Sequence, residues 1–415
     1  MDNGRRPTHG EPASVRSFDR SRPSSAGRQP LVGLVLTGGG ARSAYQIGVL
    51  RALGELLPRG RNPFPVIVGT SAGAVAAAVL ASQAHRWRKA IAGLEDVWAN
   101  FRVSQVFLVD ALHMLRAGLH WTLSLMTSGL LLAPPRSILD NSPLRELLSL
   151  RIEWPRIRAS IERGHLRAVA LCATSYASGQ SVTFFDAADE VEEWARSQRL
   201  GRRTLLTLDH LMASVGVPLL FPPMRLGEEY FGDGAMRQLA PLSPAVHLGA
   251  DRLLVLGVRA RRAAGVATTQ IPSGSPTPGQ IFGFMLDTLF TDQIFADLEQ
   301  LERLNELVRA APESVPGLRE VETLMLAPSI DPREIAARHV GEMPRGLRAL
   351  LRVIGAGDLA GSQLASYLMF DAGFTRELIE LGYRDAMEAR TALVAFMSGE
   401  RLPSVLAASG VAQAT

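Results

Sequence analysis

A serine set between two glycines is the residue in this chain best suited to act as a nucleophile. Ser71 lies in Gly69-Thr-Ser-Ala-Gly73, which has the pattern G-x-S-x-G. An apolar, β-branched run precedes this motif and the alanine-rich run 74–81 follows it. A strand, a sharp turn and a helix are therefore predicted in the order that exposes a serine hydroxyl. Gly69 and Gly73 leave room for the strained turn, and the helix start directs its positive dipole end at Ser71.

A second glycine cluster precedes the serine. Gly38, Gly39 and Gly40, followed by Ala41, lie between an apolar run that predicts a strand and a run that predicts a helix. Backbone N–H groups at such a helix start can bind an anion. No Gly-Lys-Ser/Thr follows, which argues against a nucleotide phosphate loop. Ser43 stands where the dinucleotide motif needs its last glycine. We therefore expect these four residues to form an oxyanion hole.

A carboxylate completes the set of reactive groups. Asp233 lies in a Gly-Asp-Gly turn with Gly234, after an apolar stretch, where it can accept the proton of a serine hydroxyl. Taken alone, Asp-Gly is an ordinary turn dipeptide. His247 is the alternative base, since it follows in the serine, acid, histidine order of α/β-hydrolases. The segment 241–249, however, is typical of a helix leading into a strand, so we expect His247 to be a partly buried helix residue.

The predicted elements that position these groups alternate between strands and helices up to about residue 258. This alternation indicates a mostly parallel sheet covered by helices, which is an α/β fold. Helical periodicity follows at 282–309 and 378–397, and 323–328 is typical of one more strand. The 415 residues, 47% of them hydrophobic, suffice for a large core.

Composition restricts the partners and the location of the protein. The net charge is +4 and nearly all of the positive charge is arginine, which is compatible with weak attraction to an anionic membrane surface. No compact basic run with interleaved aromatics is present, so no nucleic acid is expected. No secretory signal is visible. We expect a cytoplasmic protein with peripheral membrane contact as the alternative; the oligomeric state stays open.

The stretch 106–133 is unusual because its second half, 121–133, carries no formal charge. The uncharged segment 121–133 is too short for a confident membrane span, and His113, Arg116 and His120 interrupt the stretch before it. Two interpretations stay open for it. One is a packed helix or a wall of the substrate pocket, and the other is a lid or a membrane-docking element.

Together the three motifs resemble the patatin-like phospholipase family. The family pattern is a glycine-rich oxyanion loop, then G-x-S-x-G, then a later D-G-G or D-G-A. Here these are Gly38-Gly-Gly-Ala-Arg42, Gly69-Thr-Ser-Ala-Gly73 and Asp233-Gly-Ala235. The segments 172–180 and 213–223 also look like the family, and the resemblance covers roughly 31–258. Ser43 departs from the pattern, because many members carry glycine there.

The resemblance implies a three-layer α/β/α fold with a mostly parallel central sheet and a helical C-terminal extension. The resemblance places a patatin-like catalytic domain at 31–260. Composition and periodicity predict the other boundaries, which are a disordered tail at 1–30, a linker or mobile loop at 261–280, a mainly helical region at 281–400 with a strand near 323–328, and a flexible tail at 401–415.

The resemblance also implies a Ser-Asp dyad, in which Ser71 attacks an ester carbonyl and Asp233 accepts its proton. Arg42 then supports the oxyanion loop or meets a lipid phosphate, unless it simply pairs with a nearby carboxylate. The implied activity is that of a phospholipase- or lysophospholipase-type lipid acyl hydrolase on phospholipid or other lipid esters. No metal or cofactor is expected. The alternatives are acyl transfer to an alcohol at the same site and a non-enzymatic lipid-binding module.

Overall fold

The computed structural model describes residues 30–60, 62–108, 119–120, 123, 126–127, 137–260, 275–312, 318–356 and 362–402. The predicted N-terminal tail, apart from residue 30, lies outside the described residues. So do most of 121–133, the part of the predicted linker at 261–274, and residues 403–415 of the predicted C-terminal tail.

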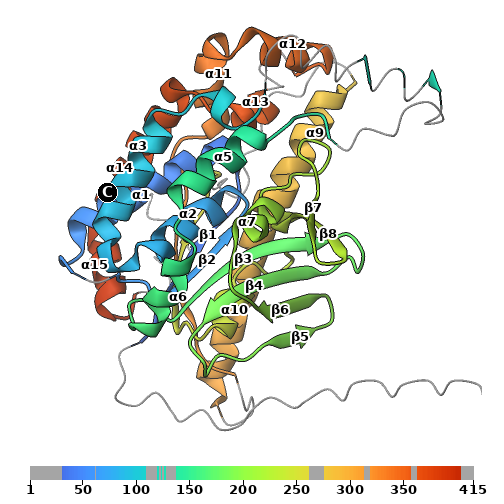
Figure 1. The fold of residues 1–415 in the computed structure, drawn as a ribbon. Helices are drawn as coiled ribbons and strands as arrows, with labels where there is room; N and C mark the ends of the chain where they lie inside the picture. Colours follow the sequence, from blue (N-terminus) through green and yellow to red (C-terminus); the bar gives the residue numbers. More distant parts are fainter. Residues whose placement is uncertain are drawn as a thin grey trace, which may run out of the picture.

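A mixed, mostly parallel sheet forms the centre of the molecule (Figure 1). Five of its strands run parallel in the order β10-β9-β1-β2-β3. Continuous Val and Leu runs form these strands because both faces of the sheet are covered, as is usual for parallel sheets. Their bounds are β1 Val32–Leu36, β2 Val66–Thr70, β3 Ala168–Ser175, β9 Arg252–Leu256 and β10 Glu322–Leu326.

The other half of the sheet is largely antiparallel. Beyond β3 the order continues with β4, β6 and β5, while β8 pairs with the end of β3 and β7 pairs with β8. The bounds are β4 Ser181–Ala187, β5 Trp194–Arg196, β6 Arg199–Arg203, β7 Met224–Leu226 and β8 Glu229–Asp233.

Helices cover both faces of the sheet, so the molecule has three layers. Side chains of the central strands alternate between two cores: Leu34 and Ile67 enter one, and Val35 and Val68 the other. The second core is closed by α8 and α10, and the first by most of the other helices (Figure 1). The helices are α1 Ala44–Leu56, α2 Ala72–Ser82, α3 Trp87–Ala99, α5 Ser142–Arg151, α6 Pro155–Glu162, α7 Leu208–Ser214, α8 Ser243–His247, α9 Pro278–Asp287, α10 Gln293–Ala310, α11 Pro332–His339, α12 Arg345–Val353, α13 Ser362–Leu368, α14 Ala372–Glu388 and α15 Arg390–Ser398.

The predicted α/β/α fold with C-terminal helices is confirmed. The structure also shows how the C-terminal part joins the rest, because β10 extends the central sheet and α14 packs along α1. Two glycines permit this close helix contact. A Cβ on Gly48 of α1 would collide with the carbonyl oxygen of Ile379, and one on Gly382 of α14 with that of Tyr45. No helix within the described ranges is both long and apolar enough to cross a lipid bilayer.

The close approach of α1 and α14 yields a stability prediction. Gly382→Ala should lower the free energy of unfolding by about 2 kcal/mol, because the new methyl group forces two packed backbones apart. Gly93→Ala in α3 is the matched control, since nothing lies within 4 Å of its added Cβ. That change should stabilise the protein by about 0.5–1 kcal/mol, because alanine favours the helix. Urea unfolding of both variants measures the difference; equal effects would contradict the packing argument.

Candidate active site

Two strands end against each other on one edge of β3, and this brings Ser71 close to Asp233. β2 runs parallel to β3, and its last residue, Thr70, pairs with Cys172. β8 runs antiparallel along the same edge, and its last residue, Asp233, pairs with Ala173. The ends of the two strands therefore occupy consecutive positions on β3. Ser71, which follows β2 directly, lies beside the end of β8 although the two are far apart in the sequence.

Ser71 forms the predicted sharp turn between β2 and α2. Its backbone has φ 54° and ψ −127°, a conformation that costs a non-glycine residue free energy. A Cβ on Gly69 would lie 2.5 Å from the carbonyl oxygen of Gly73, and one on Gly73 would collide with the carbonyl oxygen of Leu36. The contacts of the turn therefore require both glycines of the motif.

A buried serine holds the turn in place. The Ser71 N–H donates to the Ser214 hydroxyl oxygen at 3.0 Å, and that hydroxyl donates to the Cys172 carbonyl oxygen at 2.6 Å. Ser214 thus ties the turn to β3. Ser214 and its role were not identified from the sequence, where residues 213–223 stood out only as a family-like stretch.

Asp233 is a buried carboxylate with one free oxygen. Its Oδ1 accepts the Ala235 N–H at 2.9 Å, while its Oδ2 is buried and has no hydrogen-bond partner among the described residues. Its backbone N–H donates to the Gly216 carbonyl oxygen at 2.9 Å. A side chain at position 234 would collide with the Cys172 carbonyl oxygen, so this turn also requires glycine. The geometry fixes Asp233 firmly and leaves Oδ2 free to receive a proton.

Burial raises the pKa of Asp233 to about 7, although the nearby Ser71 hydroxyl and the Ala235 N–H partly offset the effect. The two side chains are close, but no hydrogen bond of ordinary geometry joins the Ser71 hydroxyl to Asp233. Catalytic hydrogen bonds are often long before substrate binds. A carboxylate with this pKa is suited to general base catalysis near neutral pH.

The glycine loop lies directly beside Ser71. A Cβ on Gly38 would be 2.9 Å from the Cβ of Ser71, and one on Gly39 would be 2.5 Å from the side chain of Val258. Gly40 has φ 53°, and a Cβ there would collide with the Tyr367 carbonyl oxygen. Within the described part of the chain, no acceptor takes the N–H of Gly38 or Gly39. Ala41 follows in a short 3-10 helix, Gly40–Ser43, and is buried.

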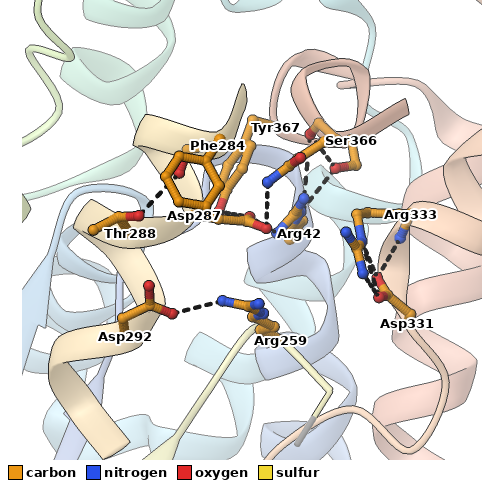
Figure 2. A network of polar contacts seen from close by, with 11 residues as sticks. Arg42, Arg259, Phe284, Asp287, Thr288, Asp292, Asp331, Arg333, Ser366 and Tyr367 are labelled. Atoms are coloured by element: carbon orange, nitrogen blue, oxygen red, sulfur yellow. Dashed lines mark hydrogen bonds and ion pairs between the residues drawn. The ribbon is translucent and has the colours of Figure 1, made fainter. Parts of the chain in front are cut away.

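Arg42 is tied to the C-terminal helices and is 1% exposed (Figure 2). Its guanidinium forms an ion pair with Asp287 at 2.8 Å, donates to the Ser366 hydroxyl at 2.8 Å, and lies 3.8 Å from the ring centroid of Tyr367. Of the three roles considered for Arg42, the structure shows the pair with a carboxylate. The side chain joins the segment after the glycine loop to α9 and α13, and it does not line the apolar pocket at Ser71.

The Asp287 carboxylate has further hydrogen-bond donors besides Arg42. It accepts hydrogen bonds from the Tyr367 hydroxyl and from the side-chain amide of Gln363, both at 2.6 Å. Burial alone would raise the pKa of Asp287, but the charge of Arg42 and the Tyr367 hydroxyl outweigh it, and the net pKa is lowered. Asp287 is therefore a carboxylate anion beside the Arg42 guanidinium. Nothing in the spacing of the sequence pointed to Asp287 or Tyr367.

An apolar pocket opens at Ser71. Its volume is about 130 Å³, close to that of apolar cavities that hold a benzene-sized molecule. Residues of α2, α3 and α5 line it together with Leu286, Phe290 and Phe370 from the C-terminal part. Of the unusual stretch 106–133, Val106 reaches the pocket. Leu119, Leu123 and Met126 are exposed, and most of the rest of that stretch lies outside the described residues.

His247 lies elsewhere. Its ring stacks on Trp194 at 4.8 Å with an angle of 12°. Burial lowers the pKa of His247 to about 4, helped by the positive charges of Arg196, Arg199 and Arg319. Its contacts in the described structure include neither member of the proposed dyad. No group of metal-ligating side chains occurs among the described residues.

A family model described as "Patatin-like phospholipase" matches residues 34–246, just over half of the chain. Human GIVD cytosolic phospholipase A2, solved in complex with methyl gamma-linolenyl fluorophosphonate, is similar at 15% identity and a TM-score of 0.42. The similarity covers 89% of this chain and 59% of that one, so this chain spans about three fifths of the human protein. VipD from Legionella pneumophila is similar at 13% identity and a TM-score of 0.30, over 94% of this chain and 82% of that one. No curated protein matches significantly.

The buried carboxylate yields a pH prediction. Folded Asp233 keeps its proton up to about pH 7, whereas the unfolded chain releases it near pH 3.9. Between these values the folded state binds more protons, so this group lowers stability as the pH rises. Asp233→Asn should therefore gain stability relative to wild type by roughly 4 kcal/mol from pH 4 to pH 8. Urea unfolding at several pH values tests this. A pH-independent difference would contradict it.

The Arg42–Asp287 pair yields another prediction. Asp287→Asn leaves the buried guanidinium without a counterion, so the free energy of unfolding should fall by about 3 kcal/mol. The kcat of ester hydrolysis should fall, whereas KM should change little, because the pair lies behind the glycine loop and outside the apolar pocket. Asp292→Asn is the matched control, since Asp292 is 51% exposed and pairs with Arg259 (Figure 2). That loss should cost less than about 1 kcal/mol; equal effects would refute the supporting role of Asp287.

Proposed function

The chain belongs to the patatin-like phospholipase family, and on this premise we propose that it is a serine lipid acyl hydrolase of the phospholipase or lysophospholipase type. Ser71 is the nucleophile and Asp233 its base. The observation that supports the proposal is that β2 and β8 end at consecutive positions on one edge of β3, so that Ser71, which lines the apolar pocket, directly follows the strand end beside Asp233.

The reaction begins when Oγ of Ser71 attacks the ester carbonyl carbon. Its proton passes to Oδ2 of Asp233, the oxygen without a partner. The tetrahedral oxyanion is stabilised by backbone N–H groups of the loop Gly38–Ala41, and one such donor typically contributes about 3 kcal/mol. The Ser71 N–H takes no part because Ser214 accepts it. Asp233 then returns the proton to the leaving alcohol as the ester bond breaks.

Water completes the cycle. It attacks the acyl group on Ser71 while Asp233 accepts one of its protons, and the proton returns to Oγ when the fatty acid leaves. The raised pKa of Asp233 helps both steps. A carboxylate near pKa 3.9 is a poor base for a serine hydroxyl. Raising the pKa to about 7 makes the proton transfer less unfavourable by roughly 4 kcal/mol.

The pocket favours an acyl chain as the group that binds beside Ser71. Its lining is mainly apolar and includes Val75 and Val79 of α2 and Trp98 of α3. Such a lining gains free energy by removing hydrocarbon from water. Phospholipid is the substrate class that the family implies, and we propose it, or another lipid ester, as the substrate of this chain.

Ser71→Ala should abolish hydrolysis and leave the fold intact. The loss of turnover should be at least about a thousandfold, because no other group can form the acyl-enzyme. The measurement is mass spectrometry of lipid products after incubation with a mixed membrane extract, with the melting temperature as the check on folding. Product formation at the wild-type rate by the folded variant would refute Ser71 as the nucleophile.

A comparison of Asp233→Asn with His247→Ala separates a dyad from a triad. Asparagine keeps the shape of the side chain but cannot take a proton as an anion, so turnover should fall at least about a hundredfold. His247→Ala removes a ring stacked on Trp194 and should leave turnover within about twofold, since proton transfer does not use it. Equal losses in two folded variants would favour a triad.

A further inference from the structure

Helix α9 has two apolar faces, and only one is used by the pocket. Leu286 lines the pocket, and Asp287 turns inward to Arg42. On the other face Ile281, Phe284 and Met285 are 47%, 65% and 50% exposed. Their spacing of three and four positions places them side by side. Asp287 is the one charged residue in this helix and it is buried, so the exposed face carries no charge.

Helix α12 presents a basic face. Leu347 and Leu351 are buried, whereas Arg345, Arg348 and Arg352 recur at three- and four-residue spacing on another side of the helix. The helix contains no acidic residue. For these three arginines the described structure shows no ion pair.

The two helices meet end to end. The N–H of Gly279, at the start of α9, donates to the Ile354 carbonyl oxygen at 2.8 Å. The Thr277 hydroxyl donates to the Gly355 carbonyl oxygen at 2.8 Å. α9 therefore begins where α12 ends, next to Val353, which is 84% exposed. Figure 1 shows the two helices at the same end of the molecule.

We propose that these residues form one surface that docks on an anionic phospholipid bilayer. The α9–α12 surface consists of Ile281, Phe284, Met285, Arg345, Arg348, Arg352 and Val353. Its uncharged apolar part suits the boundary between head groups and acyl chains. Its arginines, of which Arg345 and Arg352 are exposed and Arg348 is half-buried, suit lipid phosphates and the negative surface potential. This combination of apolar and basic groups on adjacent helices is what favours a bilayer over a second copy of the chain, which would bring arginines against arginines.

The α9–α12 surface also shares a helix, α9, with the wall of the pocket at Ser71. α9 forms the pocket wall with Leu286 and offers Phe284 and Met285 to the bilayer, so docking holds the acyl pocket next to its lipid. This inference rests on the proposed function for its purpose, but binding can be measured without catalysis. Ser71→Ala protein is the appropriate background, because it leaves the vesicles intact.

The test is co-sedimentation of the 415-residue Ser71→Ala protein with vesicles of phosphatidylcholine alone or mixed equally with phosphatidylglycerol. Binding to the mixed vesicles should weaken about tenfold in Phe284→Ser/Met285→Ser. It should weaken about tenfold in Arg345→Gln/Arg352→Gln, which should also lose the preference for anionic lipid. Leu307→Ser in α10, 55% exposed, and Arg390→Gln in α15 are the matched controls and should bind like the parent.

Circular dichroism and melting temperatures establish that each variant is folded. Unchanged binding of both double variants, or equal losses in the controls, would overturn the docking surface. The docking surface and the proposed function can fail independently. Hydrolysis that persists in Ser71→Ala protein would refute the proposed active site, whatever the vesicle binding shows. Hydrolysis that requires Ser71 would support the active site even if the docking surface failed its test.

Discussion

The shared edge of β3 is the constraint on which the rest of the candidate site depends. Because β2 approaches from one end and β8 from the other, the chain places Thr70 and Asp233 opposite the consecutive residues Cys172 and Ala173. The backbone must therefore turn out of the sheet directly after Thr70 and directly after Asp233. This explains the strained conformation of Ser71 and the glycine at 234, where any Cβ would meet the Cys172 carbonyl oxygen. The register of the sheet thus fixes the relative positions of Ser71 and Asp233 more accurately than a flexible loop could.

The second requirement is a dry environment, and the C-terminal part of the chain supplies much of it. A buried carboxylate lowers stability at neutral pH, which is the usual cost of a group tuned for proton transfer. Phe290 and Tyr367 pack around the glycine loop, and the Arg42–Asp287 pair joins that loop to α9. The contact of α1 with α14 and the addition of β10 to the sheet make the same connection on a larger scale. The helices from α9 onward are therefore structurally continuous with the half of the chain that carries Ser71 and Asp233.

The sequence predicted the local parts of this arrangement and the late strand near 323–328, and the family resemblance linked Ser71 to Asp233, but the partners of Arg42 and His247 were missed. The turn at Ser71 and the need for glycine at positions 69 and 73 follow from short-range sterics, and they could be read from a five-residue motif. The partner of Arg42 could not, because Asp287 is 245 positions away and contributes to no periodic pattern. The stacking of His247 on Trp194 is equally non-local. Its placement in a short helix was predictable, since Pro244 and the flanking residues are typical of a helix start.

The central claim is that Asp233 accepts the proton of Ser71 directly. The most direct measurement is the rate at which a fluorophosphonate probe labels Ser71 as a function of pH, in wild-type protein and in Asp233→Asn. The account predicts that the wild-type rate rises about tenfold per pH unit below a pKa of about 7 and then levels off. In Asp233→Asn the labelling should be slow and should lack this rise. The same ionisation in both proteins would show that another group activates Ser71.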